Sequence, residues 1–485
     1  MTPYIHLFRT SEGFYCYDVN TDCILRIPSD AFEYLEATMS GDTNPMVPNS
    51  VKELAENGFL KADHVISTEH PDTDLLEYHC RNRIEGLILQ VTQNCNLHCD
   101  YCTYSGGYIN RRHNDKVMSF ETATKAIDFF VAHSKDSSRL NLSFYGGEPL
   151  LQFDLIRKCV EYIENQVEGK QLIYNFTTNG TLLSDKVVDF AVSRDFLITV
   201  SLDGPEPIHD KNRKFSGEGN GSFKTIIKNL KQIKTRYPDY YRKNISFNIV
   251  LETDNYNEVK NFFDTNSLFY DTTLMPTLVS DVNKNGVVTK SEQYYEEAKY
   301  SHFIACLCLL ERLDSQEKSF ISSDLISIGE GRKDKHGKQR NVMPQRWHHG
   351  GPCIPGVMRL FVDVDGRFFP CEKVSEACDA LVIGDIARGY DIRKVEELLN
   401  IERKMNGKCF DCWAYSECKM CIGSIGIDET ESELEQRCKS IRSQVENNMK
   451  DYCVLRSLGA EFEEESDDQE TRCKTERSWL WKQRE

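Results

Sequence analysis

The sequence lacks any long apolar run, and it has no excess of positive charge. None of the 485 residues belongs to a stretch that could span a bilayer, and the first 18 residues contain no apolar core of the length a signal peptide needs. The formal net charge is −17. Nucleic acids and anionic membrane surfaces both attract cationic proteins, so neither is an expected partner. We therefore expect a cytoplasmic protein.

Cysteine, by contrast, is abundant, with 19 residues. Disulfides are rare in a reducing cytosol, and an odd number of cysteines cannot pair completely. Clustered cysteines in such a compartment are more often metal ligands or catalytic groups. The composition therefore predicts metal binding before any motif is considered.

The length suits two or three domains, and residues 1–80 read as a separate module. Three short apolar stretches predict strands, and helices are expected at 29–39 and 50–60 with Ser29 and Ser50 as N-caps. A hairpin followed by two short helices resembles a winged-helix peptide-recognition element. The alternative is a decoration that packs on the main domain.

Residues 84–285 alternate apolar strands with amphipathic helices, which predicts a parallel sheet covered by helices. Six such units favour an α/β fold with an open, partial (β/α)6 barrel over a closed eightfold barrel. In such barrels the functional residues lie at the carboxyl ends of the strands. The expected strands are 87–92, 140–147, 172–180, 197–204, 245–251 and 273–279.

The rest of the chain divides into three segments. Residues 286–345 are polar apart from an apolar helix near 300–313, and they form a bridge. Residues 346–450 are rich in cysteine, and 451–485 form a strongly charged tail.

A cysteine triplet, Cys95, Cys99 and Cys102, follows the first expected barrel strand. Three thiolates at this spacing can hold three corners of a 4Fe-4S cluster, which leaves the fourth iron open to a small molecule. A zinc site would require a fourth cysteine or histidine nearby, for which His98 is the local candidate.

The second barrel strand ends in Gly146, Gly147, Glu148 and Pro149, and together with the triplet this motif resembles the radical SAM superfamily. The resemblance implies that S-adenosylmethionine (SAM) binds the open iron and is cleaved to a 5′-deoxyadenosyl radical. The glycines would let backbone approach the methionine part, and a carboxylate or carbonyl there would accept from its ammonium.

Polar residues at further strand ends complete the expected SAM site. By the same resemblance, Arg213 reaches the SAM carboxylate and Tyr101 packs near adenine, since a guanidinium suits a planar carboxylate. Polar groups also cap strand ends for structural reasons alone, which is the alternative for each of them. The residues expected around the adenosyl part are Thr178, Asn179, Ser201 and Asp203.

The cysteine-rich segment resembles the SPASM domain, which holds auxiliary iron–sulfur clusters. The resemblance assigns one cluster to Cys409, Cys412, Cys418 and Cys438, and another to Cys353, Cys371 and Cys421. Only two residues separate Cys418 from Cys421, where the usual pattern has three. A zinc ribbon on Cys409, Cys412, Cys418 and Cys421 is the rival interpretation.

The second of these clusters has only three assigned ligands. Cys378, Cys306 and Cys308 are candidates for the fourth. We also consider the hypothesis that the site stays open and binds a substrate cysteine thiolate there.

The loop after the triplet resembles that of one particular group within the superfamily. Residues 104–108 (YSGGY), followed by Arg112, His113 and Met118, resemble the thioether-forming maturases of cysteine-rich ribosomal peptides, the ranthipeptide and sactipeptide group. The resemblance implies a precursor peptide whose leader binds residues 1–80, often as an added strand. It also implies a reductant such as flavodoxin or ferredoxin, and a cysteine sulfur-to-carbon thioether as the product.

Three alternatives stay open at this point. An anaerobic sulfatase maturase, which makes formylglycine, has similar motifs. A radical SAM enzyme that forms carbon–carbon crosslinks or epimerises a peptide is equally compatible with the barrel. A non-catalytic iron–sulfur electron-transfer protein is disfavoured by the intact glycine motif.

Overall fold

The computed structural model describes most of the chain in two compact units. The described residues are 2–42, 46–102, 113–217, 219–251, 254–279, 291–314, 342–349, 353–405, 407–426 and 429–460. The N-terminal unit comprises the described parts of 1–64, 301–344 and 442–485. The barrel unit comprises those of 65–300 and 345–441.

The N-terminal unit begins with a three-stranded antiparallel sheet in the order β1-β2-β3. Its core places Phe32, Leu35 and Val51 of the two following helices against Ile5 and Cys16 of the sheet. The three strands and two helices predicted here are confirmed. Their bounds are β1 Ile5–Thr10, β2 Gly13–Asp18, β3 Cys23–Ile27, α1 Ser29–Met39 and α2 Asn49–Glu56.

The predicted N-caps of these helices are wrong. Pro28 and Pro48 occupy the N-cap positions, and neither helix has a side-chain cap. The fixed φ of proline suits the extended backbone at that position, so the turn that begins each helix forms one or two residues early. Ser29 is instead the first residue of α1, and the Ser50 hydroxyl donates to Asp30.

The barrel unit contains six parallel strands in the order β12-β11-β9-β8-β7-β5, which confirms the open, six-unit α/β sheet. Every residue of β5 is buried, as expected for a parallel strand covered on both faces. The strands are β5 Gly86–Thr92, β7 Arg139–Gly146, β8 Gln171–Thr178, β9 Leu197–Ser201, β11 Ile245–Leu251 and β12 Thr273–Leu278.

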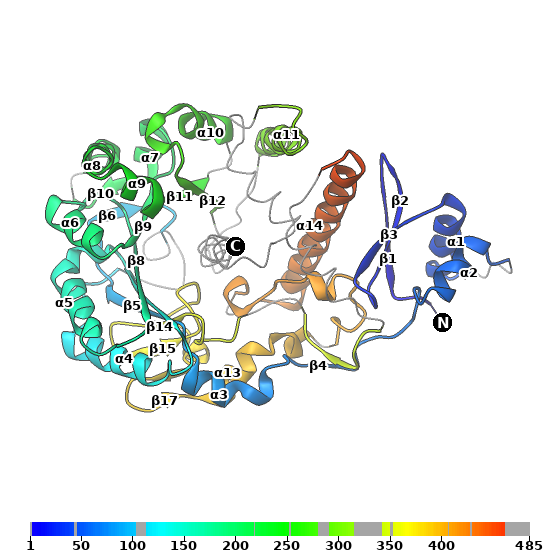
Figure 1. The fold of residues 1–485 in the computed structure, drawn as a ribbon, viewed down its shortest axis with the longest axis horizontal. Coiled ribbons are helices and arrows are strands. Elements are labelled where there is room, and N and C mark those ends of the chain that lie inside the picture. The colour runs from blue at the N-terminus through cyan, green and yellow to red at the C-terminus, as the bar shows by residue number, and fades with distance from the viewer. Residues whose placement is uncertain are drawn as a thin grey trace. The chain divides into compact units, whose positions relative to one another are not determined.

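Helices cover the outer face of this sheet, and Figure 1 shows α4, α5, α6 and α8 along it. The amphipathic helices predicted between the strands are present as α4 Phe120–Ala132, α5 Phe153–Glu164, α6 Asp185–Ser193, α8 Phe223–Arg236 and α10 Tyr256–Thr265. Two short helices were not predicted, α7 Glu206–Asn212 and α9 Pro238–Asn244.

The cysteine-rich segment extends the same sheet beyond β5. Strand β14 (Leu360–Val362) pairs parallel with β5, and β15 (Arg367–Phe369), β16 (Gly384–Asp385) and β17 (Gly389–Tyr390) follow antiparallel. Backbone packs closely at this junction, since a Cβ on Gly86 would lie 2.6 Å from the Met358 carbonyl oxygen. The segment is therefore continuous with the barrel rather than appended to it.

The remaining elements include two long helices, α11 and α14. Helix α14 continues across residue 450, where the sequence places the start of the tail, and residues 461–485 lie outside the described chain. Helix α11 contains most of the apolar helix expected near 300–313. The bounds are β4 Ser67–Thr68, α3 Leu76–Asn82, α11 Glu292–Leu309, β13 Arg346–Trp347, α13 Ile392–Leu399 and α14 Glu431–Ser457.

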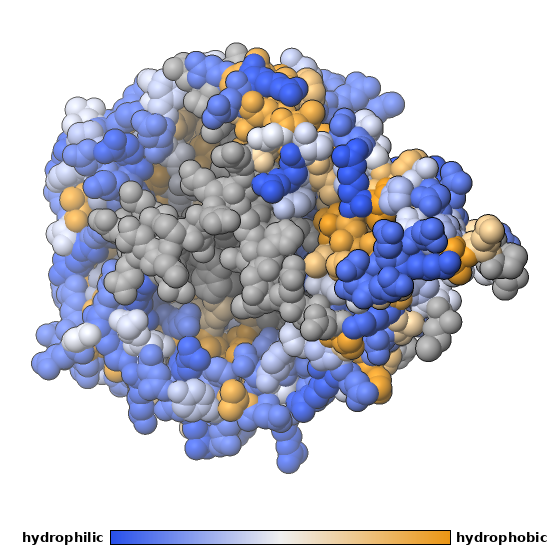
Figure 2. All heavy atoms as spheres, turned by 45° about the vertical axis from the view of Figure 1, so that its right-hand side comes forward, coloured by the Kyte–Doolittle hydropathy of each residue, from blue (hydrophilic) through white to orange (hydrophobic). Residues whose placement is uncertain are grey.

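The surface of the molecule is mainly hydrophilic on the face drawn in Figure 2. Figure 2 shows a face on which hydrophilic side chains predominate, with apolar ones in smaller patches between them. Among the described helices, none combines the length and apolar character that a membrane span requires.

A buried hydrogen-bond junction joins β5 to the cysteine-rich segment, and it yields a stability prediction. The Gln90 amide donates to Glu376 at 2.7 Å and accepts from the Val364 amide at 3.2 Å. Gln90→Met leaves both partners without that bond, so we expect a loss of about 2–4 kcal/mol. A lowered melting temperature checks this. Gln166→Met, on an exposed side chain, is the control, and equal melting temperatures for the two variants would contradict the prediction.

Candidate functional site

The cysteine triplet lies in a loop that a small strand pair holds in place. Cys99 ends β6 (Leu97–Cys99), which pairs antiparallel with β10 (Arg213–Phe215), so that Cys99 lies opposite Arg213. The Leu97 amide donates to the Cys95 sulfur at 3.4 Å, and the Cys102 amide donates to the Cys99 carbonyl. The chain thus brings the three cysteines together.

The three thiols also influence one another electrostatically. Burial raises the pKa of Cys95 to about 12, and the nearby Glu148, Cys99 and Cys102 add to the rise. Burial likewise raises the pKa of Cys99 to about 11. Such thiols become thiolates when a metal coordinates them. The donor set therefore fits an iron–sulfur cluster with three protein ligands.

Residues 103–112, which carry most of the loop motif, lie outside the described residues. His113 follows them, and a hydrogen bond with Cys102 raises its pKa. The sequence indicated His113 only as part of a family motif.

Gly146 and Gly147 pack closely against the backbone of the cysteine loop. A Cβ on Gly146 would lie 2.0 Å from the Thr92 oxygen, and one on Gly147 would lie 2.2 Å from the Asn94 oxygen. The Gly147 amide donates to the Thr92 carbonyl at 3.0 Å. The close approach that the glycines permit here is therefore to the loop's own backbone, while their approach to the methionine part of SAM stays a prediction.

Glu148 joins the ends of β7 and β8. Its carboxylate accepts from the Thr178 hydroxyl and the Asn179 amide, both at 2.7 Å, and from the Leu150 amide at 3.0 Å. The side chain is completely buried, and burial raises its pKa to about 7 despite these three donors. The Glu148 carboxylate, which would accept from the SAM ammonium in the expected site, therefore already accepts three hydrogen bonds from the protein itself.

Asn179 connects β8 to the cysteine loop. Its side-chain amide donates to Asn96 at 2.8 Å and to the Cys95 sulfur at 3.8 Å. Its side-chain oxygen accepts from the amide and the hydroxyl of Thr181. A hydrogen bond of this kind orients a metal ligand and tunes the metal it binds.

Asp203 and Arg213 form a buried ion pair at the end of β9. The Arg213 Nε and Nη2 atoms donate to Asp203 at 2.7 and 3.2 Å, and the Val250 amide donates to the same carboxylate. The Tyr101 hydroxyl donates to Asp203 as well, and the Arg213 guanidinium lies 5.3 Å from the Tyr101 ring centre. Burial alone would raise the pKa of Asp203, but Arg213 holds it below its usual value.

The structure thus brings Tyr101, Asp203 and Arg213 into one cluster, with Ser201 buried nearby at the end of β9. In the described chain, the side chains of Arg213 and Tyr101 contact each other and Asp203. Their expected contacts with the SAM carboxylate and with adenine stay predictions.

His209 is a site residue that sequence reasoning missed. The Asp203 amide donates to its Nδ1 at 3.3 Å, so its Nε2 carries the proton and donates to the Ser222 hydroxyl at 2.9 Å. That hydroxyl in turn donates to the Arg213 carbonyl. Burial lowers the pKa of His209 to about 3, which keeps it neutral. His209 therefore positions the Asp203–Arg213 pair.

One of the two predicted cysteine sets gathers around Cys409. Its thiol interacts electrostatically with Cys412, Cys418 and Cys438, and burial raises its pKa to about 12. Cys438 comes from α14, whereas the other three lie in the turns before it. The chain thus brings together four cysteines that span 30 positions of sequence.

The other set gathers Cys353, Cys371 and Cys421. A Cβ on Gly423 would lie 3.9 Å from the Cys371 sulfur and 3.7 Å from the Cys421 sulfur. Cys353 interacts electrostatically with Cys421. Two cations lie close to this set, Arg359 and Lys373, and Arg359 also pairs with Glu372 at 2.9 Å.

Three cysteines are candidates for the fourth ligand of this set, and the structure gives the neighbours of each. Cys306 interacts with His302 on α11, and Cys308 donates to the Asp314 carbonyl at 3.4 Å, both within the N-terminal unit. Cys378 precedes a short 3-10 helix, Asp379–Leu381. The fourth ligand therefore stays unassigned.

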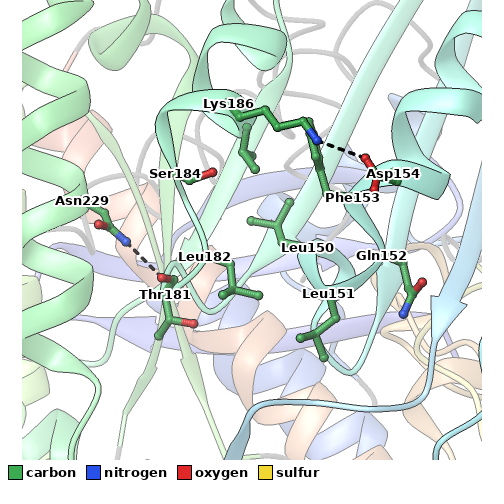
Figure 3. Close-up of a pocket in the computed structure, with 11 residues that line it drawn as sticks. Leu150, Leu151, Gln152, Phe153, Asp154, Thr181, Leu182, Ser184, Lys186 and Asn229 are labelled. Carbon is green, nitrogen blue, oxygen red and sulfur yellow. Dashed lines mark hydrogen bonds and ion pairs between the residues drawn. The ribbon is translucent and has the colours of Figure 1, made fainter.

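A hollow of about 510 Å³ lies between the starts of α5 and α6 (Figure 3). Leu150, Leu182 and Lys186 are among its lining residues, and none of the described residues that line it is a cysteine. Asn229 of α8 closes one side by donating to the carbonyls of Gly180 and Thr181. We assign this hollow no role in the chemistry of the cysteine loop.

The buried ion pair predicts a large effect of one substitution. Asp203→Asn leaves the Arg213 charge buried without a counter-charge, which costs about 3–5 kcal/mol. The melting temperature of the cluster-loaded protein should therefore fall strongly. The control is Asp185→Asn, because the Asp185–Arg236 pair is exposed and such pairs contribute about 0–1 kcal/mol. Similar losses in both variants would refute this account.

Glu148 predicts a pH dependence of stability. Its folded-state pKa of about 7 lies above its ordinary value of 4.5, so the folded state binds the extra proton between these pH values. Its contribution to the free energy of unfolding is full below about pH 4.5 and is lost as the pH rises through about 7. The melting-temperature difference between the wild type and Glu148→Gln should shift against the wild type from pH 5.5 to 8. A constant difference would mean that Glu148 does not titrate in this range.

Comparison with known proteins places this site in a family. Residues 89–265 match the Radical SAM superfamily. The radical SAM cyclopropyl synthase TigE of Paramaledivibacter caminithermalis is 24% identical over 273 residues, which cover 52% of this chain and 56% of TigE. The chain thus spans about half the length of that relative.

A longer match is to the cysteine-type anaerobic sulfatase-maturating enzyme of Clostridium novyi. It is 27% identical over 363 residues, covering 69% of this chain and 86% of the relative. Among solved structures, native anSMEcpe with bound AdoMet and Kp18Cys peptide has a TM-score of 0.54 at 18% identity, covering 77% of this chain and 99% of that one. The barrel, the cysteine loop and the match to the superfamily lead to one conclusion: residues 89–265 of this chain form a radical SAM domain.

Proposed function

We propose that this enzyme is a peptide maturase that forms intramolecular thioethers between cysteine sulfur and carbon in a ribosomally made, cysteine-rich precursor. The observation that carries the proposal is the gathering of seven further cysteines into two sets, in a segment that shares its sheet with the barrel. A SPASM-type pair of auxiliary clusters would use these sets. The sulfatase-maturating relative supports action on a cysteine of a protein substrate.

In this proposal Cys95, Cys99 and Cys102 hold a 4Fe-4S cluster whose open iron binds SAM. When bound, these cofactors supply a 5′-deoxyadenosyl radical. The cluster's ligands are positioned by the chain itself. Asn179 donates to the Cys95 sulfur, and the ion-paired Arg213 sits opposite Cys99 with its charge held by Asp203.

The bond changes of thioether formation require an electron acceptor. One S–H and one C–H bond of the peptide break, and one S–C bond forms. The C–H hydrogen leaves as an atom to the deoxyadenosyl radical, the thiol proton goes to solvent, and one electron is left over. The sets around Cys409 and Cys371 would hold the centres that accept it before a flavodoxin or ferredoxin partner exchanges electrons with the protein.

The set of Cys353, Cys371 and Cys421 offers a place for the peptide thiol. With three assigned protein ligands, it would leave one coordination position for a substrate thiolate. Arg359 and Lys373 lie beside these thiols, and two cations favour the deprotonated sulfur.

The N-terminal unit would bind the leader of the precursor. Among the described residues, β3 pairs only with β2, so its other edge is available to an added strand. Most of β3 is only half-buried, which leaves room for side chains of a docked peptide. Recognition by strand addition relies on main-chain hydrogen bonds and therefore tolerates varied leader sequences.

A second candidate function is formylglycine formation, as in sulfatase maturation. The long match to the sulfatase-maturating relative and the fold shared with anSMEcpe favour it. That reaction replaces a cysteine thiol or serine hydroxyl by an aldehyde, so its product differs chemically from a thioether.

Mass spectrometry of a cysteine-rich precursor separates these functions. After anaerobic reaction with the reconstituted enzyme, SAM and a reductant, we expect a loss of two hydrogens per crosslink and cysteines that resist alkylation. Cys95→Ala should abolish the change, since one ligand of the radical-generating cluster is missing. Cys371→Ser should abolish crosslinking while cleavage of SAM continues.

Other outcomes would redirect the assignment. A loss of two hydrogens with every cysteine still alkylated would indicate carbon–carbon crosslinks. An aldehyde that reacts with a hydrazide would establish formylglycine formation, and an unchanged peptide mass with inverted residues would indicate epimerisation.

A further inference from the structure

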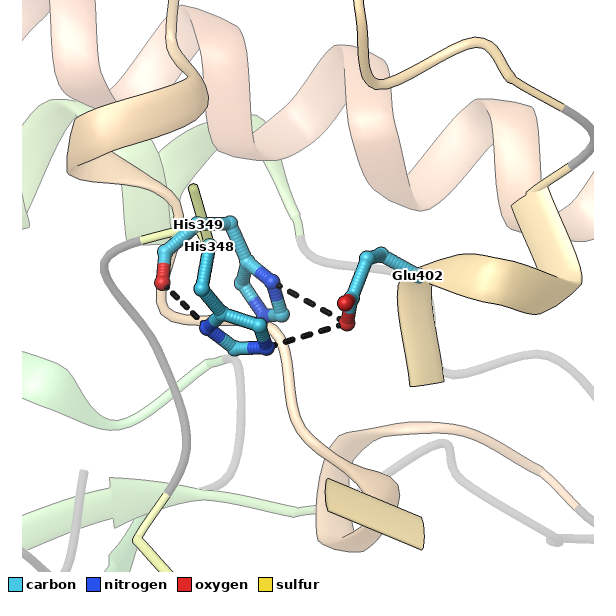
Figure 4. Close-up of side chains that lie close together, drawn as sticks. All are labelled: His348, His349 and Glu402. Atoms are coloured by element: carbon cyan, nitrogen blue, oxygen red, sulfur yellow. Dashed lines mark hydrogen bonds and ion pairs between the residues drawn. The ribbon is translucent and has the colours of Figure 1, made fainter. Parts of the chain in front are cut away.

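Two adjacent histidines and a glutamate converge in the barrel unit. His348 and His349 follow β13, and Glu402 lies in a 3-10 helix, Ile401–Met405. Their exposed fractions are 4%, 5% and 3%. His348 Nε2 lies 3.0 Å and His349 Nδ1 lies 3.5 Å from the same carboxylate oxygen, Oε2 of Glu402 (Figure 4).

The other nitrogen of each ring fixes its tautomer. His348 Nδ1 lies 2.7 Å from the His349 carbonyl, and His349 Nε2 lies 2.7 Å from the Met420 carbonyl. A carbonyl only accepts, so these nitrogens carry the hydrogens. In the neutral rings, the two nitrogens that face Glu402 therefore present lone pairs.

Three electron-pair donors thus face one another in a buried place. Apart from these contacts with one another, His348 Nε2, His349 Nδ1 and both oxygens of Glu402 have no side-chain hydrogen-bond partner in the described chain. Leaving such groups buried and unsatisfied is costly, and a cation between them removes that cost.

The spacing fits a single ion. Ligands bound at 2.0–2.1 Å to a tetrahedral ion lie about 3.3 Å from one another. The two distances to Glu402 are 3.0 and 3.5 Å, and all three ligand atoms lie within 4.8 Å of one another. Metal-bound histidines also typically donate their second nitrogen to a backbone carbonyl, as both rings do here.

We propose that His348 Nε2, His349 Nδ1 and the Glu402 carboxylate bind a divalent transition-metal ion, zinc, separate from the iron of the cysteine sets. Two imidazoles and a carboxylate suit zinc, whereas thiolate sets suit iron–sulfur clusters. Because the three ligands are buried, the ion would stabilise the fold rather than contact a substrate.

The position of the site indicates what the ion would stabilise. His349 donates to the carbonyl of Met420, which lies between Cys418 and Cys421. The Tyr415 hydroxyl contacts the Trp347 carbonyl at 2.9 Å, next to His348. The ion would therefore fix the loop that supplies one cysteine to each of the two sets.

The experiment is a metal analysis of the full-length, cluster-loaded protein, purified anaerobically from zinc-supplemented medium. We expect about one zinc per chain in addition to iron, with nitrogen and oxygen ligands at about 2.0–2.1 Å and no sulfur at about 2.3 Å in the zinc X-ray absorption spectrum. Glu402→Gln and His348→Gln should each lower zinc by at least about tenfold with the triplet cluster intact.

The matched control is His133→Gln, which alters a half-buried histidine whose Nδ1 contacts the Phe129 carbonyl of α4, and this variant should keep its zinc. Iron content and circular dichroism show whether each variant folds. Wild-type protein that binds no zinc, even after incubation with excess Zn²⁺, would overturn the proposal and leave a buried histidine–carboxylate ion pair. Zinc with sulfur ligands would overturn it too, because the ion would then occupy a cysteine set. Since the wild-type spectrum alone identifies the ligands, a variant that fails to fold does not remove the test.

Discussion

Two backbone carbonyls, those of Thr92 and Asn94, occupy the space where Gly146 and Gly147 would carry a Cβ, and the whole strand-end face depends on that contact. This backbone contact holds the cysteine loop against the end of β7. Glu148 then extends the contact to β8 through Thr178 and Asn179. The position of each cysteine in the triplet is thus set by backbone packing before any cofactor binds.

A buried network of polar groups completes this face at β9. The Asp203 carboxylate accepts hydrogen bonds from Arg213, Tyr101 and the Val250 amide. The neutral His209 accepts from the Asp203 amide. Buried charges tolerate such a location only when they are paired and hydrogen-bonded. The same residues that the family resemblance connects with SAM are therefore also the residues that keep the end of the barrel in one arrangement.

Much of this could be predicted from the sequence, because the signals are local. Each barrel strand is a mainly apolar run of five to eight residues between helical patterns, and the resemblance to the SPASM domain assigned the two cysteine sets. Strands β14 to β17 have two or three residues each, too few for any period to show. The pairing of Asp203 with Arg213 and the convergence of His348, His349 and Glu402 depend on tertiary packing, and no spacing rule indicates them.

The order of strands in the sheet also has a consequence for synthesis. Leu87 of β5 pairs with Leu360 of β14, a partner that the ribosome adds only after the entire barrel has been made. At translation rates of 5–20 residues per second, that edge of β5 waits on the order of tens of seconds. An uncovered strand edge is a template for pairing with other chains. On the ribosome, that edge of β5 therefore stays without its β14 partner until the cysteine-rich segment has been synthesised.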